Sequence, residues 1–91
     1  MNKGWITLIE LARDFLKNKI SAEDFSERTA RESQKLYGVV EPNEMINSCA
    51  GELFITADRY NPDADRDSSE LDEAELRVEV EKLLREYHLY E

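Results

Sequence analysis

The sequence predicts an all-α protein, an antiparallel four-helix bundle in a single domain that covers residues 1–91. Three observations predict this class. Apolar residues recur at intervals of three and four, which is the period of a helix that buries one face. Only three glycines and two prolines interrupt the chain. No stretch shows the strict apolar–polar alternation of a half-buried strand, and four helices with short connections are typical of an antiparallel bundle.

The first predicted helix covers residues 4–17. Its apolar positions form one stripe, and Lys17 and Lys19 follow near its carboxyl end, where positive charge suits the helix dipole. The residues that we expect it to bury are Ile6, Ile9, Ala12, Phe15 and Leu16.

The second predicted helix begins after Ser21 and continues to Gly38. Asp24 follows Ser21 at the spacing of a capping box, and Ile20 and Phe25 occupy the two positions of a hydrophobic staple. Gly38 suits the left-handed backbone that ends many helices. Because the middle of this helix is polar, we expect it to contact the core through a narrow apolar stripe.

Pro42 predicts the start of the third helix, since the amide hydrogen that proline lacks would have no partner in a first turn, and Pro62 predicts its end. This helix has the clearest amphipathic pattern of the chain. Its apolar row consists of Met45 or Ile46, Cys49, Ala50, Leu53, Phe54, Ala57 and Tyr60.

The fourth predicted helix opens at Asp67 or Ser69, which are both good N-cap residues, and runs to about His88. Two adjacent apolar rows follow its length. One row consists of Leu71, Ala74 and Val78, and the next of Leu76, Val80, Leu83 and Tyr87.

Acidic residues are concentrated in the last third of the chain. The formal net charge is −9 at pH 7, and residues 61–91 contain eleven acidic and four basic residues. This charge argues against direct binding to nucleic acid or to an anionic membrane, whose phosphates would repel the protein. It favours a basic protein as the partner. The densest stretch contains Asp58, Asp63, Asp65, Asp67, Glu70, Asp72, Glu73 and Glu75.

Part of this stretch has a local explanation. Acids near the start of the fourth helix complement its dipole, and aspartates in the preceding loop are typical turn residues. These residues are Glu70, Asp72 and Glu73 for the helix, and Asp63 and Asp67 for the loop. The explanation does not cover the acids that crowd the end of the third helix, where negative charge opposes the dipole. Asp58, Asp63 and Asp65 are therefore the leading candidates for a partner-binding function.

A calcium site is the main alternative for the same loop. Asp63, Asp65 and Asp67 alternate as the first, third and fifth ligands of a helix–loop–helix calcium site would. However, position six is Ser68 rather than glycine, and position twelve is Ala74, where a bidentate glutamate is required. We therefore predict neither a bound metal nor any other cofactor.

Residues suited to catalysis are sparse. The chain has one histidine, His88, near the end of the fourth helix, one cysteine, Cys49, on the apolar row of the third, and no glycine-rich phosphate loop. We predict a non-enzymatic protein without catalytic residues. A single cysteine cannot form an intramolecular disulfide, and residues 1–4 lack the apolar run of a signal peptide, so we expect a cytoplasmic protein that does not enter a membrane.

Several short segments carry a resemblance to a known family. They are Phe15-Leu16, Lys19-Ile20, Phe25-Ser26-Glu27-Arg28, Leu36-Tyr37-Gly38-Val39, Glu52-Leu53-Phe54, Pro62-Asp63-Ala64-Asp65-Arg66 and Val78-Glu79-Val80. In their shared order and spacing over most of the chain, they resemble the colicin D immunity protein family. Members of that family are small helical proteins that protect a bacterium from its own tRNA-cleaving toxin.

The resemblance implies a four-helix antiparallel bundle whose acidic surface occludes the basic active site of a colicin D-like tRNase toxin domain, and thereby mimics tRNA in charge. The family's acids around the end of the third helix fall by position on Asp58, Asp63 and Asp65. Two positions depart from the expected pattern, because Asp58 replaces a longer glutamate and Asn61 replaces an acid. The resemblance therefore leaves the exact cognate toxin open.

The predicted partner-binding residues are Asp58, Tyr60, Asn61, Asp63, Asp65, Asp67 and Glu70. Tyr60 follows the apolar row of the third helix, so we expect a packed ring whose hydroxyl can reach the surface. The sequence does not decide whether Trp5 covers the core or stands exposed as an anchor. We expect a monomer when free and a 1:1 heterodimer with the toxin. A small acidic adaptor that binds a basic protein unrelated to a nuclease is the alternative function.

Overall fold

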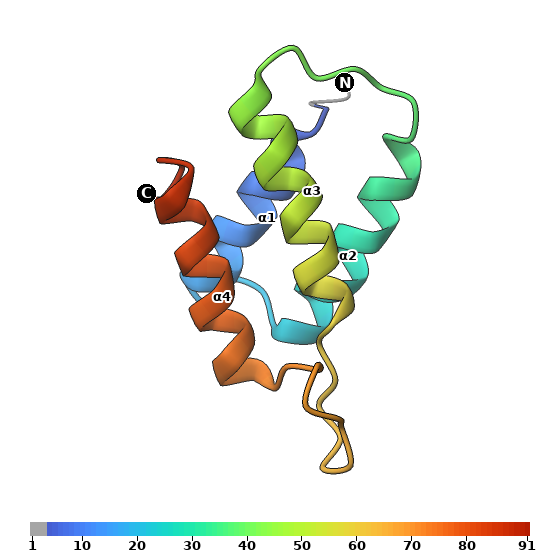
Figure 1. Cartoon of the computed structure of the whole chain (residues 1–91), viewed down its shortest axis with the longest axis vertical. Coiled ribbons are helices and arrows are strands. Elements are labelled where there is room, and N and C mark those ends of the chain that lie inside the picture. Colours follow the sequence, from blue (N-terminus) through green and yellow to red (C-terminus); the bar gives the residue numbers. More distant parts are fainter. Residues whose placement is uncertain (1–3) are drawn as a thin grey trace.

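The structure is a computed structural model that describes residues 4–91, which form four helices (Figure 1). These are α1 (Ile6–Leu16), α2 (Ala22–Lys35), α3 (Glu44–Asp58) and α4 (Glu73–Glu86). The predicted all-α, four-helix fold is confirmed. Figure 1 shows that the three connections lie at alternate ends of the helices. The expectation about a signal peptide concerns Met1–Lys3, which lie outside the described residues.

Helices α1 and α3 form the centre of the fold. Each of them packs against the other three helices, whereas α2 and α4 hardly touch each other. Between α1 and α2, the rings of Phe15 and Phe25 stack with their centroids 4.9 Å apart. The main core consists of Ile9, Ala12, Phe15, Ala22, Phe25, Cys49, Leu53, Ala57, Leu71, Leu76, Val80 and Leu84. A smaller cluster of Leu8, Leu36 and Ala50 lies beneath the partly buried ring of Trp5.

Local signals determine several helix ends. Ser21 is the N-cap of α2, because its hydroxyl accepts a hydrogen bond from the Asp24 amide at 3.0 Å, as predicted. Gly38 has φ +86°, the left-handed conformation expected of a glycine beyond a helix end. Asn18 after α1 and His88 after α4 adopt the same conformation, with φ +63° and +58°, which the sequence interpretation missed.

The predicted start of the third helix at Pro42 is wrong by two residues. Asn43 caps α3, because its side-chain oxygen accepts from the amides of Met45 at 3.0 Å and Ile46 at 3.2 Å. Pro42 therefore precedes the cap. The side chain of Asn43 accepts hydrogen bonds from two backbone amides of the first turn. A proline side chain cannot accept these bonds.

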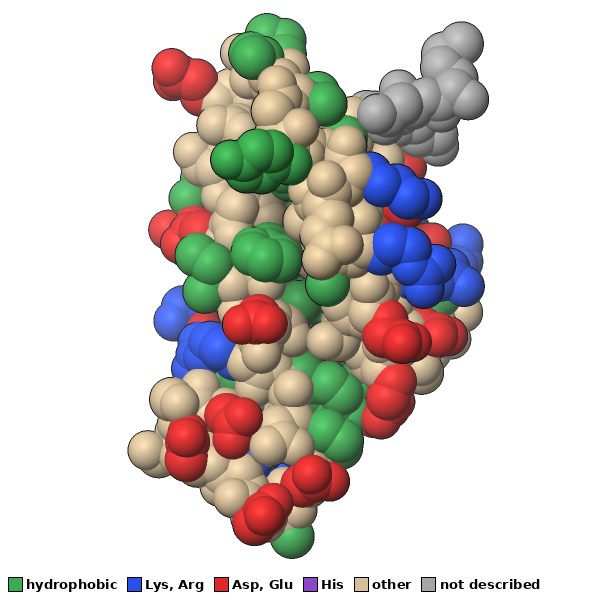
Figure 2. Space-filling view, turned by 90° about the vertical axis from the view of Figure 1, so that its right-hand side faces the viewer, with side chains coloured by type: hydrophobic (Ala, Val, Ile, Leu, Met, Phe, Trp, Pro, Cys, Tyr) green, Lys and Arg blue, Asp and Glu red, His purple; other side chains and the backbone are tan. Residues whose placement is uncertain are grey.

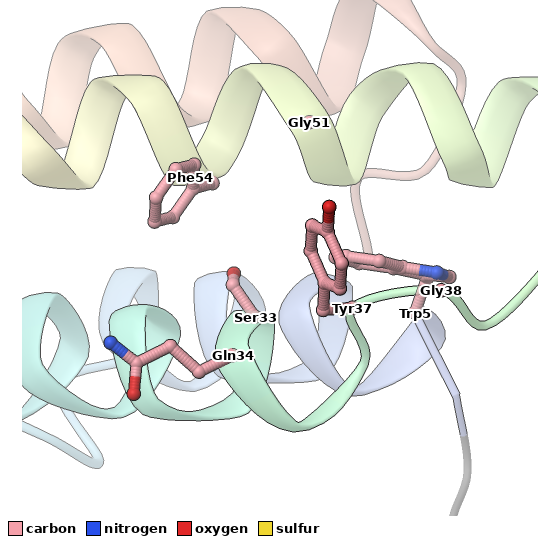
Figure 3. Close-up of a pocket in the computed structure, with 7 residues that line it drawn as sticks. All are labelled: Trp5, Ser33, Gln34, Tyr37, Gly38, Gly51 and Phe54. Carbon is pink, nitrogen blue, oxygen red and sulfur yellow. The ribbon is translucent and has the colours of Figure 1, made fainter.

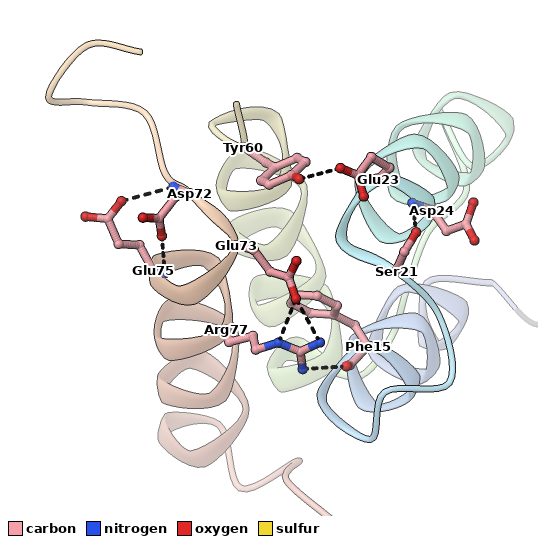
Figure 4. A network of polar contacts seen from close by, with 9 residues as sticks. All are labelled: Phe15, Ser21, Glu23, Asp24, Tyr60, Asp72, Glu73, Glu75 and Arg77. Carbon is pink, nitrogen blue, oxygen red and sulfur yellow. Dashed lines mark hydrogen bonds and ion pairs between the residues drawn. The ribbon is translucent and has the colours of Figure 1, made fainter. Parts of the chain in front are cut away.

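The predicted start of the fourth helix at Asp67 or Ser69 is also wrong. Helix α4 begins after Asp72, whose carboxylate accepts from the Glu75 amide at 2.8 Å, while the Glu75 carboxylate accepts from the Asp72 amide at 3.0 Å. This reciprocal pair is a capping box (Figure 4). The residues before it cannot continue the helix, because the backbone amide and carbonyl of Leu71 bond to Arg59 and Asn61, which follow α3.

The helix rows are buried only in part. In α4, the row that contains Leu76 and Val80 faces the core, whereas Val78 is 64% exposed. In α3, Phe54 is 40% and Met45 is 43% exposed, although both were predicted on the apolar row. The other three helices cover the part of α3 that contains Cys49, Ala50, Leu53, Thr56 and Ala57, so positions beside this stripe remain at the surface.

Arg77 fastens α4 to α1. Its guanidinium lies 4.4 Å from the centroid of the Phe15 ring and donates to the Phe15 carbonyl at 2.9 Å. The same group contacts the carboxylate of Glu73 at 3.3 Å (Figure 4). One side chain thus provides a hydrogen-bond donor for a carbonyl at the end of α1 and holds α4 against α1.

Candidate partner-binding surface

The acidic loop, defined here as residues 59–72, joins α3 to α4 at one end of the molecule (Figure 1). Its two ends are held together by main-chain hydrogen bonds. The Leu71 amide donates to the Arg59 carbonyl at 2.8 Å, and the Asn61 amide donates to the Leu71 carbonyl at 2.9 Å. The Arg59 side chain adds a bond to the Ser69 carbonyl at 2.8 Å. The loop is therefore closed at its base.

Two of the predicted site acids are used inside the loop. One carboxylate oxygen of Glu70 accepts from the Asn61 side chain at 3.2 Å and from the Asp67 amide at 3.0 Å. Asp67 in turn accepts from the amide and hydroxyl of Ser69, and these bonds lower the pKa of its carboxyl. Asn61, Asp67 and Glu70 are thus brought together. The expectation that Glu70 complements the dipole of the fourth helix is wrong, because Glu70 lies before that helix.

Arg66 holds the tip of the loop. It donates to the Asp63 carbonyl at 2.9 Å and to the carboxylate of Asp72 at 3.2 Å. The Asp63 amide donates to the side chain of Asn61 at 2.9 Å. These bonds fix the backbone of Asp63 while leaving its carboxylate unused. The sequence analysis gave Arg66 no role in the site, although its position among acids was a signal that it pairs within the loop.

Three predicted site acids keep free carboxylates. Asp58, Asp63 and Asp65 are exposed, and within residues 4–91 their side chains make no hydrogen bond or ion pair. Asp63 and Asp65 lie on the loop, and Asp58 is the last residue of α3. Figure 2 shows acidic side chains gathered over this end of the molecule. Carboxylates without internal partners are available to cations of another molecule.

Tyr60 connects the loop to α2. Its hydroxyl donates to the Glu23 carboxylate at 2.7 Å (Figure 4). Burial and this hydrogen bond raise the pKa of Tyr60 to about 12, and the same bond lowers the pKa of Glu23. The ring is half-buried and packs against the core, as its place on the apolar row predicted. Its hydroxyl is used to position the loop.

The loop encloses a polar hollow that the sequence did not predict. It has a volume of about 510 Å³, and its wall contains acidic groups around one base. The lining residues are Ala64, Arg66, Asp67, Ser68, Glu70, Asp72 and Glu75. Within residues 4–91, no group of three or more acidic, histidine or cysteine side chains is placed to hold a metal ion.

The two candidate residues for catalysis lie apart from this surface. Cys49 is buried in the core, and burial raises the pKa of its thiol to about 11, so the thiol stays protonated at neutral pH. His88 is exposed beyond the end of α4. None of the four described helices is both long and apolar enough to cross a bilayer.

Fold and surface together define a small acidic helical protein with a shaped acidic loop at one end. The chain matches the model of the family described as bacterial self-protective colicin-like immunity over residues 5–87. This match covers nearly the whole chain, so the protein belongs to that family. No curated protein matches the chain. Family membership assigns it an immunity role, which implies binding to a cognate toxin and is generally non-enzymatic.

Proposed function

We propose that the protein inhibits a colicin D-like tRNase by inserting its acidic loop into the basic active site of the toxin domain. The observation that carries this proposal is the set of free carboxylates on Asp58, Asp63 and Asp65. A nuclease cleft must be cationic to hold phosphates. An inhibitor that presents carboxylates to this cleft uses the field that normally attracts tRNA.

The hydrogen bonds within the loop support this mechanism. Asn61, Arg66 and Glu70 fix the backbone on which Asp63 and Asp65 stand, so little conformational entropy is lost when a toxin binds. The net charge of −9 would steer the protein to a cationic cleft and accelerate association. Carboxylate–cation pairs that lose their water on binding would slow dissociation.

The proposal includes the place and the stoichiometry of action. Because the substrate of a tRNase is cytoplasmic, the protein acts in the cytoplasm, where it captures the toxin before tRNA is cleaved. One loop fills one active site, so the complex contains one copy of each chain. Light scattering of the purified mixture would reveal a different ratio.

The direct test is a tRNA cleavage assay with a panel of colicin D-like tRNase domains. We expect stoichiometric inhibition of at least one domain by the wild-type protein. If no member of the panel is bound or inhibited, the proposed function is wrong.

Isosteric variants test the role of the loop. Asp63→Asn combined with Asp65→Asn should weaken binding by about 100-fold, since each removes one charge from a desolvated pair. The salt dependence of the affinity should also decrease. Glu44→Gln is the matched control, because Glu44 is an exposed acid at the opposite end of α3. Equal affinity of the double variant and the wild type would remove the loop acids from the interface.

A further inference from the structure

A second hollow lies between α2 and α3, away from the acidic loop (Figure 3). It has a volume of about 330 Å³ and is mainly apolar. Figure 3 shows Phe54 of α3 and Ser33 of α2 pointing toward one another across it, with Tyr37 and Trp5 at one end. We call it the aromatic groove. Its lining residues are Trp5, Ser33, Gln34, Tyr37, Gly38, Gly51 and Phe54.

The wall of the groove is fixed by the fold. The indole nitrogen of Trp5 donates to the Val39 carbonyl at 2.9 Å, which ties the start of α1 to the segment after α2. Beneath the indole ring, Leu8 and Leu36 are fully packed. The hollow is therefore a defined feature of the surface whose shape is present before any partner binds.

Aromatic side chains stand exposed around this groove. Tyr37 is 91% and Phe54 is 40% exposed, and Val40, two residues after the lining residue Gly38 in the chain, is 86% exposed. Single exposed apolar residues are common, but several around one hollow mark an interaction surface. Aromatic residues beside a pocket are typical of the residues that contribute most to protein–protein binding.

Gly51 gives independent evidence that the groove has a function. It lies in the middle of α3, where glycine destabilises a helix relative to alanine. Its φ is not left-handed, and a Cβ at this position would meet nothing within 4 Å. No contact inside the described chain therefore requires glycine here. Since the fold does not require glycine at this position, the absence of a side chain suggests that another molecule approaches the helix closely here.

The groove and the free acids lie on one side of the molecule. Phe54 and Asp58 are one turn apart on α3, so the same helix face leads from the groove to the acidic end. Figure 2 shows apolar side chains in the upper and middle part of one side of the molecule, basic side chains at its margins and acidic side chains toward its lower end. Stable interfaces combine an apolar centre with a polar rim, and this face offers both.

We propose that the aromatic groove receives an apolar side chain, aromatic or branched, from the same toxin domain whose cations meet the acidic loop. The inference rests on the proposed function. Charge favours this occupant over a second copy of the chain, because two molecules with a net charge of −9 repel each other, whereas a cationic nuclease is attracted. The groove would then anchor the complex, and the acids would steer and orient it.

The test fills the groove without disturbing the fold. Gly51→Leu and Gly51→Gln place side chains in open space on a helix, so the unfolding midpoint should stay constant or rise. Val78→Leu is the matched control, because Val78 is an exposed helical position on α4, outside the groove. The probe is a colicin D-like tRNase domain that the wild-type protein inhibits, with affinities measured by calorimetry at two salt concentrations.

We expect both Gly51 variants to bind at least about tenfold more weakly, while Val78→Leu binds as the wild type does and all variants keep the same salt dependence. Wild-type affinity in both Gly51 variants would refute binding of the toxin through the aromatic groove, while the proposed inhibition of a tRNase would still hold. A wild-type protein that dimerises through the groove, with a monomeric Gly51→Leu variant, would also refute binding of the toxin there. If the wild-type protein binds no tRNase domain, the proposed function fails and this inference fails with it.

Discussion

Truncation of Arg77 should destabilise the protein far more than truncation of Arg85, although the two side chains make similar contacts. Both are on α4, both contact a glutamate four residues earlier, and both lie over an aromatic ring. They differ in burial, since the side chain of Arg77 is 28% exposed and that of Arg85 is 60% exposed. Only Arg77 also donates to a main-chain carbonyl, that of Phe15.

The expected loss follows from these contacts. A hydrogen bond from a charged donor contributes about 1.5–3 kcal/mol, a cation–π contact about 0.5–2 kcal/mol, and an exposed helical ion pair about 0.3–0.5 kcal/mol. Because one guanidinium makes all three, the values do not add. We expect Arg77→Ala to lower the free energy of unfolding by about 2–3 kcal/mol, and its melting temperature by about 10 °C or more.

Urea titrations followed by circular dichroism measure this difference directly. Arg77→Lys should lose part of the stability, because an ammonium keeps the charge but lacks the planar fork that reaches both Phe15 and Glu73. Arg85→Ala should lie close to the wild type, since solvent competes for both of its contacts. Equal losses for Arg77→Ala and Arg85→Ala would refute the reasoning, because burial and the carbonyl bond would then be irrelevant.

Three further predictions concern stability. The buried hydroxyl of Thr29 has no hydrogen-bond partner within residues 4–91. Thr29→Val should therefore raise the free energy of unfolding, measured by urea titration, by about 1 kcal/mol. A decrease would indicate that the hydroxyl has a partner in solution. His88 has φ +58°, so His88→Gly should raise the calorimetric melting temperature, with a gain of about 0.5–1 kcal/mol; a lower value would contradict the left-handed assignment. The folded pKa of Tyr60 is about 12 against a usual 10.0, so its stabilisation is complete below pH 10 and is lost as pH rises to 12. Tyr60→Phe should remove only part of this alkaline decrease in urea midpoints, because the hydrogen bond to Glu52 and burial also raise the pKa of Tyr87 to about 12. An unchanged slope would exclude Tyr60 as a source.

The features that the sequence predicted well are those set by neighbours in the chain. Ser21 and Asp24 are three residues apart, so the geometry of the cap follows from the helix itself. Gly38 likewise adopts the conformation that glycine alone permits at low cost. Phe15 of α1 and Leu53 of α3 were predicted in the core and are fully buried, because helical periodicity identifies the centre of a buried face without knowledge of its partner.

The start of α4 required long-range information. Asp67 and Glu70 have the same spacing as Asp72 and Glu75, so the sequence offers two candidate capping boxes for the start of this helix. The first one forms in part, since the Asp67 amide donates to the Glu70 carboxylate, yet no helix follows it. The backbone amide and carbonyl of Leu71 are instead bonded to Arg59 and Asn61, just after α3. A contact between distant segments thus decides between two local signals of similar strength.

The hydrogen bonds that close the loop also divide its acids into those engaged inside the loop and those left free. The carboxylates of Asp67 and Glu70 accept hydrogen bonds within the loop. Sequence periodicity and charge counts cannot distinguish these acids from the free ones. Exposed aromatic positions such as Tyr37 were also indistinguishable from core positions, because a helical pattern does not reveal where neighbouring helices stop. Which side chains remain available for a partner is a property of the folded loop and bundle.

The end of α3 shows why the available acids point to a partner. Asp58 is the last residue of α3, and the last turn of this helix contains no basic residue, so the carboxylate opposes the helix dipole. Arg59, the nearest base in the chain, donates to the Ser69 carbonyl. The local field at this end is therefore negative in the free protein. A cation bound here would relieve the repulsion between Asp58 and the helix end, so binding at this position would stabilise the helix that presents it.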